Sequence, residues 1–372
     1  MGTYLNPGNS AFAGIRNDIY IDKSGLIELI NQSIETPGRL TCISRPRRFG
    51  KSFAAQMLCA YYDRSCNSSG LFGDLAISRT ADYRTHLNHY DVIYLNMTDV
   101  LGETSADDFV AFIRRNIVRE LVDAYPSMHV VEGFGATLAS AVQTSGRRFI
   151  MIIDEWDAPI RETPKIGQEY LTFLRALFKI DTAAADPFAA VYMTGILPIR
   201  KDGAQPAIPD FREYSMLRPG PFASYVGFTV EEVRTLCAQT RTDFHEMKRW
   251  YDGYCLRGAG SVYNPYSVIK AVLYRDYDAY WTETSSAASL MHYISRNADG
   301  LRRTIAELTG GADVPVDTKG FSNDLTTFHG RDDALTLLIH LGYLAYDEIT
   351  KKARIPNEEV RLEFVRAVHM LR

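Results

Sequence analysis

At 372 residues, with 46% hydrophobic and 23% charged residues, the chain has the composition of a folded globular protein, and its length predicts two or three packed units. The formal net charge of −4 excludes a global cationic field that would attract nucleic acid or an anionic membrane. Five scattered cysteines without a C-x-x-C pair argue against a disulfide framework and a zinc site, and no stretch is apolar enough to span a membrane, so we expect a cytoplasmic protein.

The first part of the chain alternates short apolar runs with longer amphipathic stretches. This alternation is typical of an α/β domain with a parallel sheet. Strands are expected at 40–43 (LTCI), 91–97 (DVIYLNM), 149–154 (FIMIID) and 188–195 (FAAVYMTG). Helices are expected at 51–63, 106–124, about 135–143 and 168–180, where apolar residues recur every three or four positions. The pattern predicts one α/β domain over residues 1–220.

Helical patterns dominate after residue 220, and strand signals become sparse. Thr229 and Glu232 have the spacing of a capping box, and Asn264-Pro265 is typical of a helix start. We expect a helical unit over 221–308. After the Gly310-Gly311 break, a helix, a hairpin near 343–355 and a second helix indicate a small winged-helix-like unit over 309–372.

The stretch ISRPRRFGKS (43–52) ends like a phosphate-binding loop. Gly50, Lys51 and Ser52 match the end of the pattern G-x-x-x-x-G-K-[ST], whereas Arg45 occupies the first glycine position. An apolar run precedes the loop and a helical pattern follows it, so backbone N–H groups at the helix start would face an anion. Lys51 would then reach the phosphates and Ser52 would bind Mg²⁺. An ordinary strand-to-helix turn is the open alternative.

Two adjacent carboxylates, Asp154 and Glu155, follow the apolar run FIMII. Such charges are costly at the end of a buried strand unless something uses them. In a Walker B arrangement Asp154 would hold Mg²⁺ and Glu155 would polarise the water that attacks the γ-phosphate. The alternative is a strand that ends in a solvated acidic turn.

A further buried strand ends at Thr194-Gly195 and leads to Arg200. A hydroxyl on a strand between the two Walker strands is placed to sense the γ-phosphate, so Thr194 and Arg200 are candidate catalytic residues. The alternative for Thr194 is a hydroxyl bonded to its own backbone.

Three arginines crowd the loop: Arg45, Arg47 and Arg48. Their mutual repulsion would be relieved by a bound triphosphate, and Pro46 should make the loop stiffer than a glycine-rich one. We hypothesise that Arg47 or Arg48 supplies positive charge to the phosphates. The alternative is that both pair with surface acids.

A series of ordered blocks resembles the bacterial AAA-ATPase-like family, predicted P-loop ATPases often joined to a C-terminal restriction-endonuclease-like nuclease domain. The resemblance covers nearly the whole chain. The blocks are YLNPGNSAF (4–12), IYIDKSGLIELI (19–30), RPRRFGKS (45–52), IIDEWDAPI (152–160), TGILPIRK (194–201), EYSML (213–217), GFTVEEV (227–233), RWYDGY (249–254), VYNPYSV (262–268), YWTETS (280–285), LGYLAYD (341–347) and IPNEEVRLEF (355–364).

The resemblance implies a P-loop NTPase core of the additional-strand AAA/STAND-like type, a helical lid and a small C-terminal unit. Family loops also lack the first glycine, and Trp156 stands where the family usually has tyrosine. Tyr20 and Asp22 would border the adenine, with a structural role as the alternative. ATP is expected rather than GTP. The implied nucleotide-binding residues of the loop are Arg45, Arg47, Arg48, Phe49, Gly50, Lys51, Ser52 and Phe53.

The expected function is Mg²⁺-dependent ATP binding and hydrolysis coupled to conformational change. The alternative is a slowly hydrolysing ATP-dependent switch or docking module that regulates a nuclease or another partner in DNA processing or defence. In residues 300–372 we do not predict a D…[DE]-x-K constellation of the kind that a nuclease would use. A homo-oligomer or a protein partner is compatible with the sequence, nucleic-acid binding finds no support in the charge, and no membrane association is expected.

Overall fold

The computed structural model describes residues 2–179, 186–199, 201–202, 205–206, 208, 210–281, 300–321 and 330–370. The chain divides into two compact units. The first unit comprises Met1–Ile43, Lys51–Gly195 and Ile199–Glu213, and the second comprises Ser44–Gly50, Ile196–Pro198 and Tyr214–Arg372. The finer division at residues 220 and 308 stays a prediction.

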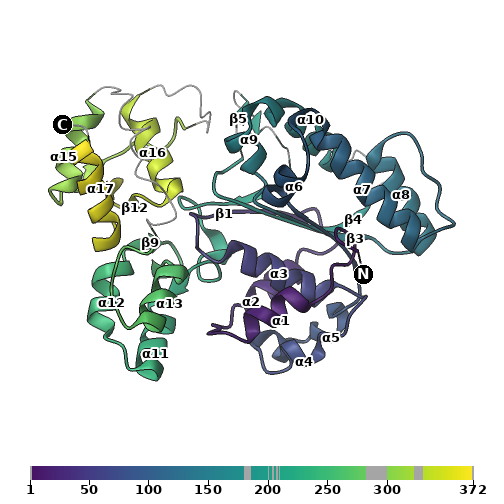
Figure 1. Ribbon diagram of the computed structural model, residues 1–372, viewed down its shortest axis with the longest axis horizontal. Coiled ribbons are helices and arrows are strands. Elements are labelled where there is room, and N and C mark those ends of the chain that lie inside the picture. The colour runs from purple at the N-terminus through teal and green to yellow at the C-terminus, as the bar shows by residue number, and fades with distance from the viewer. Residues whose placement is uncertain are drawn as a thin grey trace. The chain divides into compact units, whose positions relative to one another are not determined.

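A five-stranded sheet with the order β2-β3-β4-β1-β7 organises the first unit (Figure 1). β2 and β3 are parallel, with Asp91 opposite Phe149 and Asn96 opposite Asp154, and β3 and β4 are also parallel. β4 lies between β3 and β1, as expected for a P-loop fold with the additional strand. All four predicted strands are present and the α/β fold class is confirmed. The strands are β1 (Leu40–Ser44), β2 (Asp91–Asn96), β3 (Phe149–Asp154), β4 (Phe188–Gly195) and β7 (Arg212–Tyr214).

Helices cover both faces of this sheet (Figure 1). On one side lie α1 (Ser10–Arg16), α2 (Gly25–Asn31), α3 (Lys51–Tyr62), α4 (Ser69–Phe72) and α5 (Tyr83–His86). On the other side lie α6 (Met97–Glu103), α7 (Phe109–Ala124), α8 (Phe134–Ser145), α9 (Ala158–Glu162) and α10 (Gly167–Phe178). The predicted helices at 51–63, 106–124, 135–143 and 168–180 correspond to α3, α7, α8 and α10.

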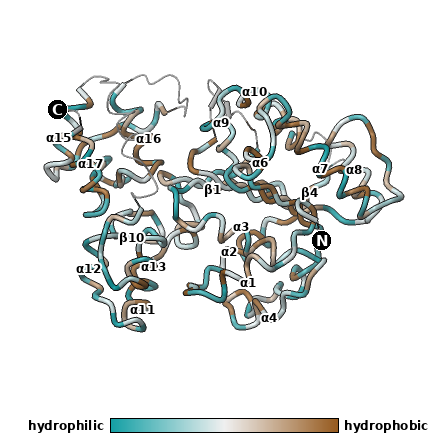
Figure 2. The backbone as a smooth tube through the Cα atoms, in the orientation of Figure 1, coloured by the Kyte–Doolittle hydropathy of each residue, from teal (hydrophilic) through white to brown (hydrophobic). Residues whose placement is uncertain are grey.

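The core of the first unit follows from this layering. Every residue of β3 and β4 is buried, because helices pack on both faces of these strands. Figure 2 shows the corresponding concentration of hydrophobic residues along the sheet. A continuous apolar run such as FIMII is the pattern that such a doubly covered strand requires.

The second unit is mainly helical. Thr229 and Glu232 form the predicted capping box at the start of α11, and the Asn264 side chain caps α13 with Pro265 as its first residue. The predicted C-terminal hairpin is present as β12 (Ala345–Asp347) and β13 (Lys352–Arg354). The helices are α11 (Val230–Thr240), α12 (Phe244–Tyr251), α13 (Pro265–Tyr274), α15 (Leu301–Thr309), α16 (Arg331–Leu341) and α17 (Glu358–Met370).

Two small antiparallel sheets accompany these helices. They have the strand orders β8-β10-β9 and β11-β13-β12. The first of them was not expected from the sequence, because strands of two to four residues are too short to show an alternating pattern. The strands are β8 (Phe228–Thr229), β9 (Tyr254–Leu256), β10 (Gly260–Tyr263), β11 (Val314–Pro315), β12 (Ala345–Asp347) and β13 (Lys352–Arg354), and a separate pair is formed by β5 (Lys201–Asp202) and β6 (Gln205–Pro206).

Candidate functional site

Four predicted site residues lie in the first unit at the carboxyl ends of β3 and β4 and at the start of α3. Asp154 ends β3, Thr194 is the penultimate residue of β4, and Lys51 begins α3; all three side chains are buried. The turn after β3 is tied to β4, because the Trp156 N–H donates to the Thr194 carbonyl over 2.9 Å. The Lys51 Nζ lies 3.9 Å from Glu155 Oε1.

Asp154 is a buried carboxylate with incomplete hydrogen bonding. The Ser52 hydroxyl bonds to its carboxylate, and the Glu155 N–H donates to its Oδ1 over 3.1 Å. Its Oδ2 has no hydrogen-bond partner among the described residues. Burial, assisted by the neighbouring Glu155, raises the pKa of Asp154 to about 6. Such an oxygen suits a cation or its water shell.

Glu155 occupies a strained turn. Its φ of 53° lies in the left-handed region, which costs a non-glycine residue about 1 kcal/mol or more. Arg161 Nη2 lies 3.2 Å from Glu155 Oε2. Burial lowers the pKa of Lys51, and the Glu155 charge opposes that shift. Both carboxylate oxygens of Glu155 therefore face cationic groups.

Thr194 presents a second unsatisfied group. Its buried Oγ1 has no partner among the described residues, so the alternative in which the hydroxyl bonds its own backbone is not realised there. The following residue must be glycine, because a Cβ on Gly195 would lie 2.6 Å from both Asp157 Oδ1 and Trp156 Cδ1. Arg200, the other candidate on this segment, lies outside the described residues.

Arg45 is a buried member of the loop segment, which belongs to the second unit. Its Nη1 donates to the Ser44 carbonyl over 2.9 Å and to the Tyr214 carbonyl over 3.3 Å. Burial and the nearby Arg45 charge lower the pKa of His340 to about 3, so that imidazole is neutral. The structure thus places Arg45 as a support of the loop backbone.

Arg47 and Arg48 are exposed, unlike Arg45. Among the described residues, neither forms an ion pair with an acidic side chain. Arg48 has a φ of 67°, and its guanidinium lies 4.8 Å from the centre of the Tyr266 ring. Gly50 has a φ of 88°, which explains the glycine at this loop position.

Aromatic residues of the second unit hold the loop backbone. The Trp281 Nε1–H donates to the Arg47 carbonyl over 3.2 Å, and the Phe49 ring packs edge-on against Tyr254 at 5.2 Å. These residues, with Tyr266, come from the blocks YWTETS, RWYDGY and VYNPYSV, which the sequence analysis did not connect with the loop. Their position in ordered blocks was the available signal.

The predicted adenine-side residues are engaged in structural contacts. The Tyr20 ring packs edge-on against Phe12 at 5.7 Å. Asp22 accepts the Ser24 N–H at 2.8 Å and the Ala76 N–H at 2.7 Å, so its carboxylate organises the backbone of the first unit. Phe53 is 58% exposed at the start of α3.

Sequence reasoning missed Arg161 and Asp157. Arg161 lies in α9, and its Nε is 2.9 Å from Asp157 Oδ2 while its Nη2 contacts Glu155. The four-residue spacing of Asp157 and Arg161 was a detectable signal, since residues at that spacing face each other once a helix forms.

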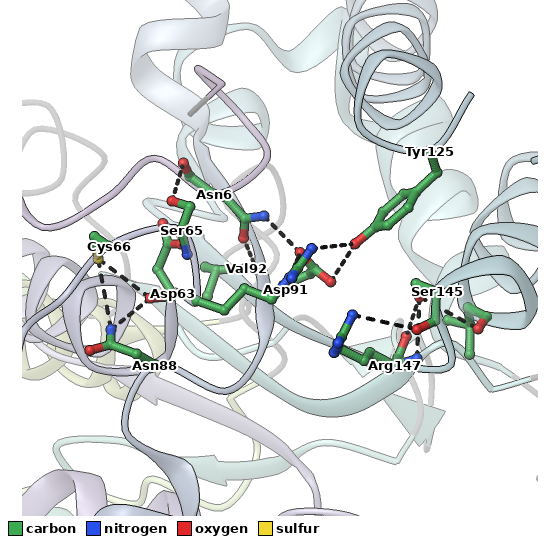
Figure 3. A network of polar contacts seen from close by, with 12 residues as sticks. Asn6, Asp63, Ser65, Cys66, Asn88, Asp91, Val92, Tyr125, Ser145 and Arg147 are labelled. Carbon is green, nitrogen blue, oxygen red and sulfur yellow. Dashed lines mark hydrogen bonds and ion pairs between the residues drawn. The ribbon is translucent and has the colours of Figure 1, made fainter. Parts of the chain in front are cut away.

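A polar network at the amino end of β2 is hydrogen-bonded more completely than Asp154 is (Figure 3). The buried Asp91 accepts from Asn6 Nδ2 at 2.7 Å, from Arg64 Nε at 2.8 Å and from the Tyr125 hydroxyl at 2.6 Å. Asn6 Oδ1 also accepts the Val92 N–H at 2.8 Å. Each of these hydrogen bonds joins two protein groups, so this network stabilises the fold.

The described residues contain no group of three or more His, Cys, Asp or Glu side chains suited to hold a metal ion alone. A nucleotide-bound Mg²⁺ needs fewer protein ligands, because phosphates and water supply the rest. None of the helices in the described ranges combines the length and the apolar character that crossing a bilayer requires.

Three comparisons relate the chain to known proteins. The profile of the family described as Predicted AAA-ATPase matches residues 7–205. An uncharacterized protein in the vnfD 5′ region of Azotobacter chroococcum mcd 1 is 25% identical over 380 residues, covering 95% of this chain and 67% of the relative. The Aeropyrum pernix ORC2 protein, solved as ADPNP-ADP complexes, aligns with a TM-score of 0.38 and 13% identity over 96% of this chain and 98% of that one.

Proposed function

The chain belongs to the family of predicted AAA-ATPases, and from this premise we propose that it binds ATP with Mg²⁺ and hydrolyses the γ-phosphate. One observation carries the proposal: the buried Asp154 has an unsatisfied Oδ2 beside Lys51, Ser52 and Glu155. A purely structural carboxylate would be costly in this state. Bound cation and phosphate would satisfy the groups that the protein leaves open.

Ser52 and Asp154 are the residues that would hold Mg²⁺. The ion would supply positive charge for the phosphate oxygens. Lys51 is kept close by Glu155 and would exchange that contact for phosphate, which relieves the burial of its ammonium group. Gly50 precedes Lys51 directly in the chain.

Glu155 is the group best suited to orient water. In hydrolysis the water oxygen forms a bond to the γ-phosphorus while the bond to the ADP oxygen breaks, and the water proton passes to a base or to phosphate. Glu155 has a carboxylate that can accept this proton once it is turned toward the water. Thr194, with its unsatisfied hydroxyl, would donate a hydrogen bond to a γ-phosphate oxygen.

A switch that binds ATP and hydrolyses it slowly is the second candidate. The observation in its favour is that Glu155 Oε1 lies 3.9 Å from Lys51 Nζ, a contact that engages the carboxylate that hydrolysis needs. In either case we propose that the nucleotide state drives a conformational change in a cytoplasmic protein that acts on itself, on further copies or on a protein partner.

Steady-state phosphate release, measured beside equilibrium binding of labelled ATP, separates the candidates. Wild type should release phosphate faster than Lys51→Ala and Glu155→Gln, and Glu155→Gln should retain ATP binding. If wild type binds ATP but releases no more phosphate than Glu155→Gln, the switch replaces the enzyme. Absence of ATP binding in wild type would reject both.

A further inference from the structure

The Glu155 carboxylate has a second neighbour whose own position is fixed from elsewhere. Arg161 is only 12% exposed, and its guanidinium divides its contacts among three carboxylates. Nη2 lies 3.2 Å from Glu155, Nε lies 2.9 Å from Asp157, and Nη1 lies 3.5 Å from Glu162. A planar guanidinium that serves several acceptors has little freedom to rotate.

Asp157 anchors this arrangement. Its side chain is buried, it pairs with the Nε of Arg161, and its backbone carbonyl accepts the Arg161 N–H over 3.0 Å at the start of α9. The close approach of Gly195 to Asp157 keeps that carboxylate packed against the end of β4. Arg161 is therefore tied to the strand that carries Thr194.

Glu155 needs such an external restraint. It sits in a turn with a left-handed φ, and its side chain is partly exposed. Its other contact is with Lys51, whose ammonium group would turn to phosphate when a nucleotide binds. Of these two cationic neighbours, Arg161 is the one that the protein itself holds in place.

We propose that Arg161 is a positioning residue that orients the Glu155 carboxylate for water activation, with Asp157 as its anchor. This role rests on the proposed ATP hydrolysis. Because orientation of a base acts on the chemical step, losing Arg161 should lower kcat about 10- to 100-fold and leave ATP affinity within about twofold.

The test combines Arg161→Gln, Arg161→Lys and Asp157→Asn with a matched control. Arg161→Lys keeps the charge but cannot serve Glu155 and Asp157 together, so it should recover only part of kcat. Asp157→Asn should lower kcat although it leaves Glu155 and Arg161 intact, and its effect should not add to that of Arg161→Gln. Arg115→Gln, which breaks an exposed ion pair in α7, should leave kcat unchanged.

A readout that needs no turnover tests the contact itself. In nucleotide-free protein, the Tm losses of Glu155→Gln and Arg161→Gln should fail to add in the double variant, since the two side chains interact. Additive Tm losses, or an unchanged kcat in Arg161→Gln while wild type hydrolyses ATP, would overturn the positioning role. If wild type itself does not hydrolyse ATP, the proposed hydrolysis is rejected and the positioning role with it. This result differs from an active wild type whose kcat does not depend on Arg161, which rejects the positioning role alone.

Discussion

Asp91 begins β2 and Asp154 ends β3, at opposite ends of two neighbouring parallel strands, and both side chains are 0% exposed. Asp91 receives hydrogen bonds from an amide, a guanidinium and a phenol (Figure 3). Asp154 keeps one oxygen without a partner among the described residues, and burial raises its pKa to about 6. A buried aspartate is therefore fully hydrogen-bonded at one end of the sheet, whereas at the other end a buried aspartate has incomplete hydrogen bonding.

This difference separates stability from function within one unit. A buried carboxylate normally needs full hydrogen bonding, because desolvation otherwise disfavours its charged form. Asp91 meets that requirement and Asp154 does not. Where a protein tolerates such a cost beside a second unsatisfied group, Thr194, we infer a ligand that completes both.

The largest expected effect comes from removing the Asp154 charge. Asp154→Asn should lower Mg²⁺-dependent phosphate release at least about 100-fold, because a neutral amide holds the cation poorly. Steady-state phosphate assays over a range of Mg²⁺ concentrations measure this loss. Asp91→Asn is the matched control, and activity per folded molecule should stay close to wild type. Equal losses in both variants would contradict the comparison.

The same variant should gain stability when nucleotide is absent and a chelator is present. The folded-state pKa of Asp154 lies near 6, above its ordinary 3.8, so the folded protein binds this proton more tightly and loses stability as the pH rises from about 4 to about 6. The shift corresponds to about 3 kcal/mol at most.

Urea unfolding of both proteins tests this pH dependence. Asp154→Asn should exceed wild type in unfolding free energy near pH 7.5, and the difference should shrink toward zero near pH 4. A difference that is independent of pH would show that the carboxylate is not destabilised by its burial.

At the amino end of β2 the same type of substitution should lower the unfolding free energy instead of raising it. Asp91→Asn should lose about 2 kcal/mol of unfolding free energy, because Arg64 and Tyr125 lose a charged acceptor. The loss stays moderate since Arg64 is partly exposed and can be hydrated. Chemical denaturation measures it, with Asn6→Ala as a second variant in the same network. If Asp91→Asn were as stable as wild type, the Asp91 network would not stabilise the fold.

Thr194→Val gives the smallest expected change in stability. The variant removes an unsatisfied buried hydroxyl, so it should gain about 1 kcal/mol in nucleotide-free protein. If the hydroxyl contacts the γ-phosphate, kcat should fall about tenfold at the same time. A stabilised variant with unchanged kcat would leave Thr194 without a part in the reaction.

The strands could be predicted from the sequence, and the Asp154–Glu155 pair could be singled out as a candidate site, for a physical reason. Fully buried strands require continuous apolar runs, and charges directly after such a run stand out. The role of Arg45 could not be predicted, because three arginines in one loop look alike until folding buries one of them. The spacing of Asp157 and Arg161 could have been noticed, but the contact between Arg161 and Glu155 depends on a left-handed φ at Glu155, which no local sequence pattern predicts.

The hydrogen bond from the Trp281 indole to the Arg47 carbonyl has a practical consequence. The chain contains three tryptophans, and Trp281 is almost completely buried while bonded directly to the loop backbone. Indole fluorescence shifts to longer wavelength when the ring gains contact with water. With Trp156 and Trp250 replaced by phenylalanine, the emission of Trp281 would serve as an intrinsic optical reporter of loop rearrangement, without any attached dye.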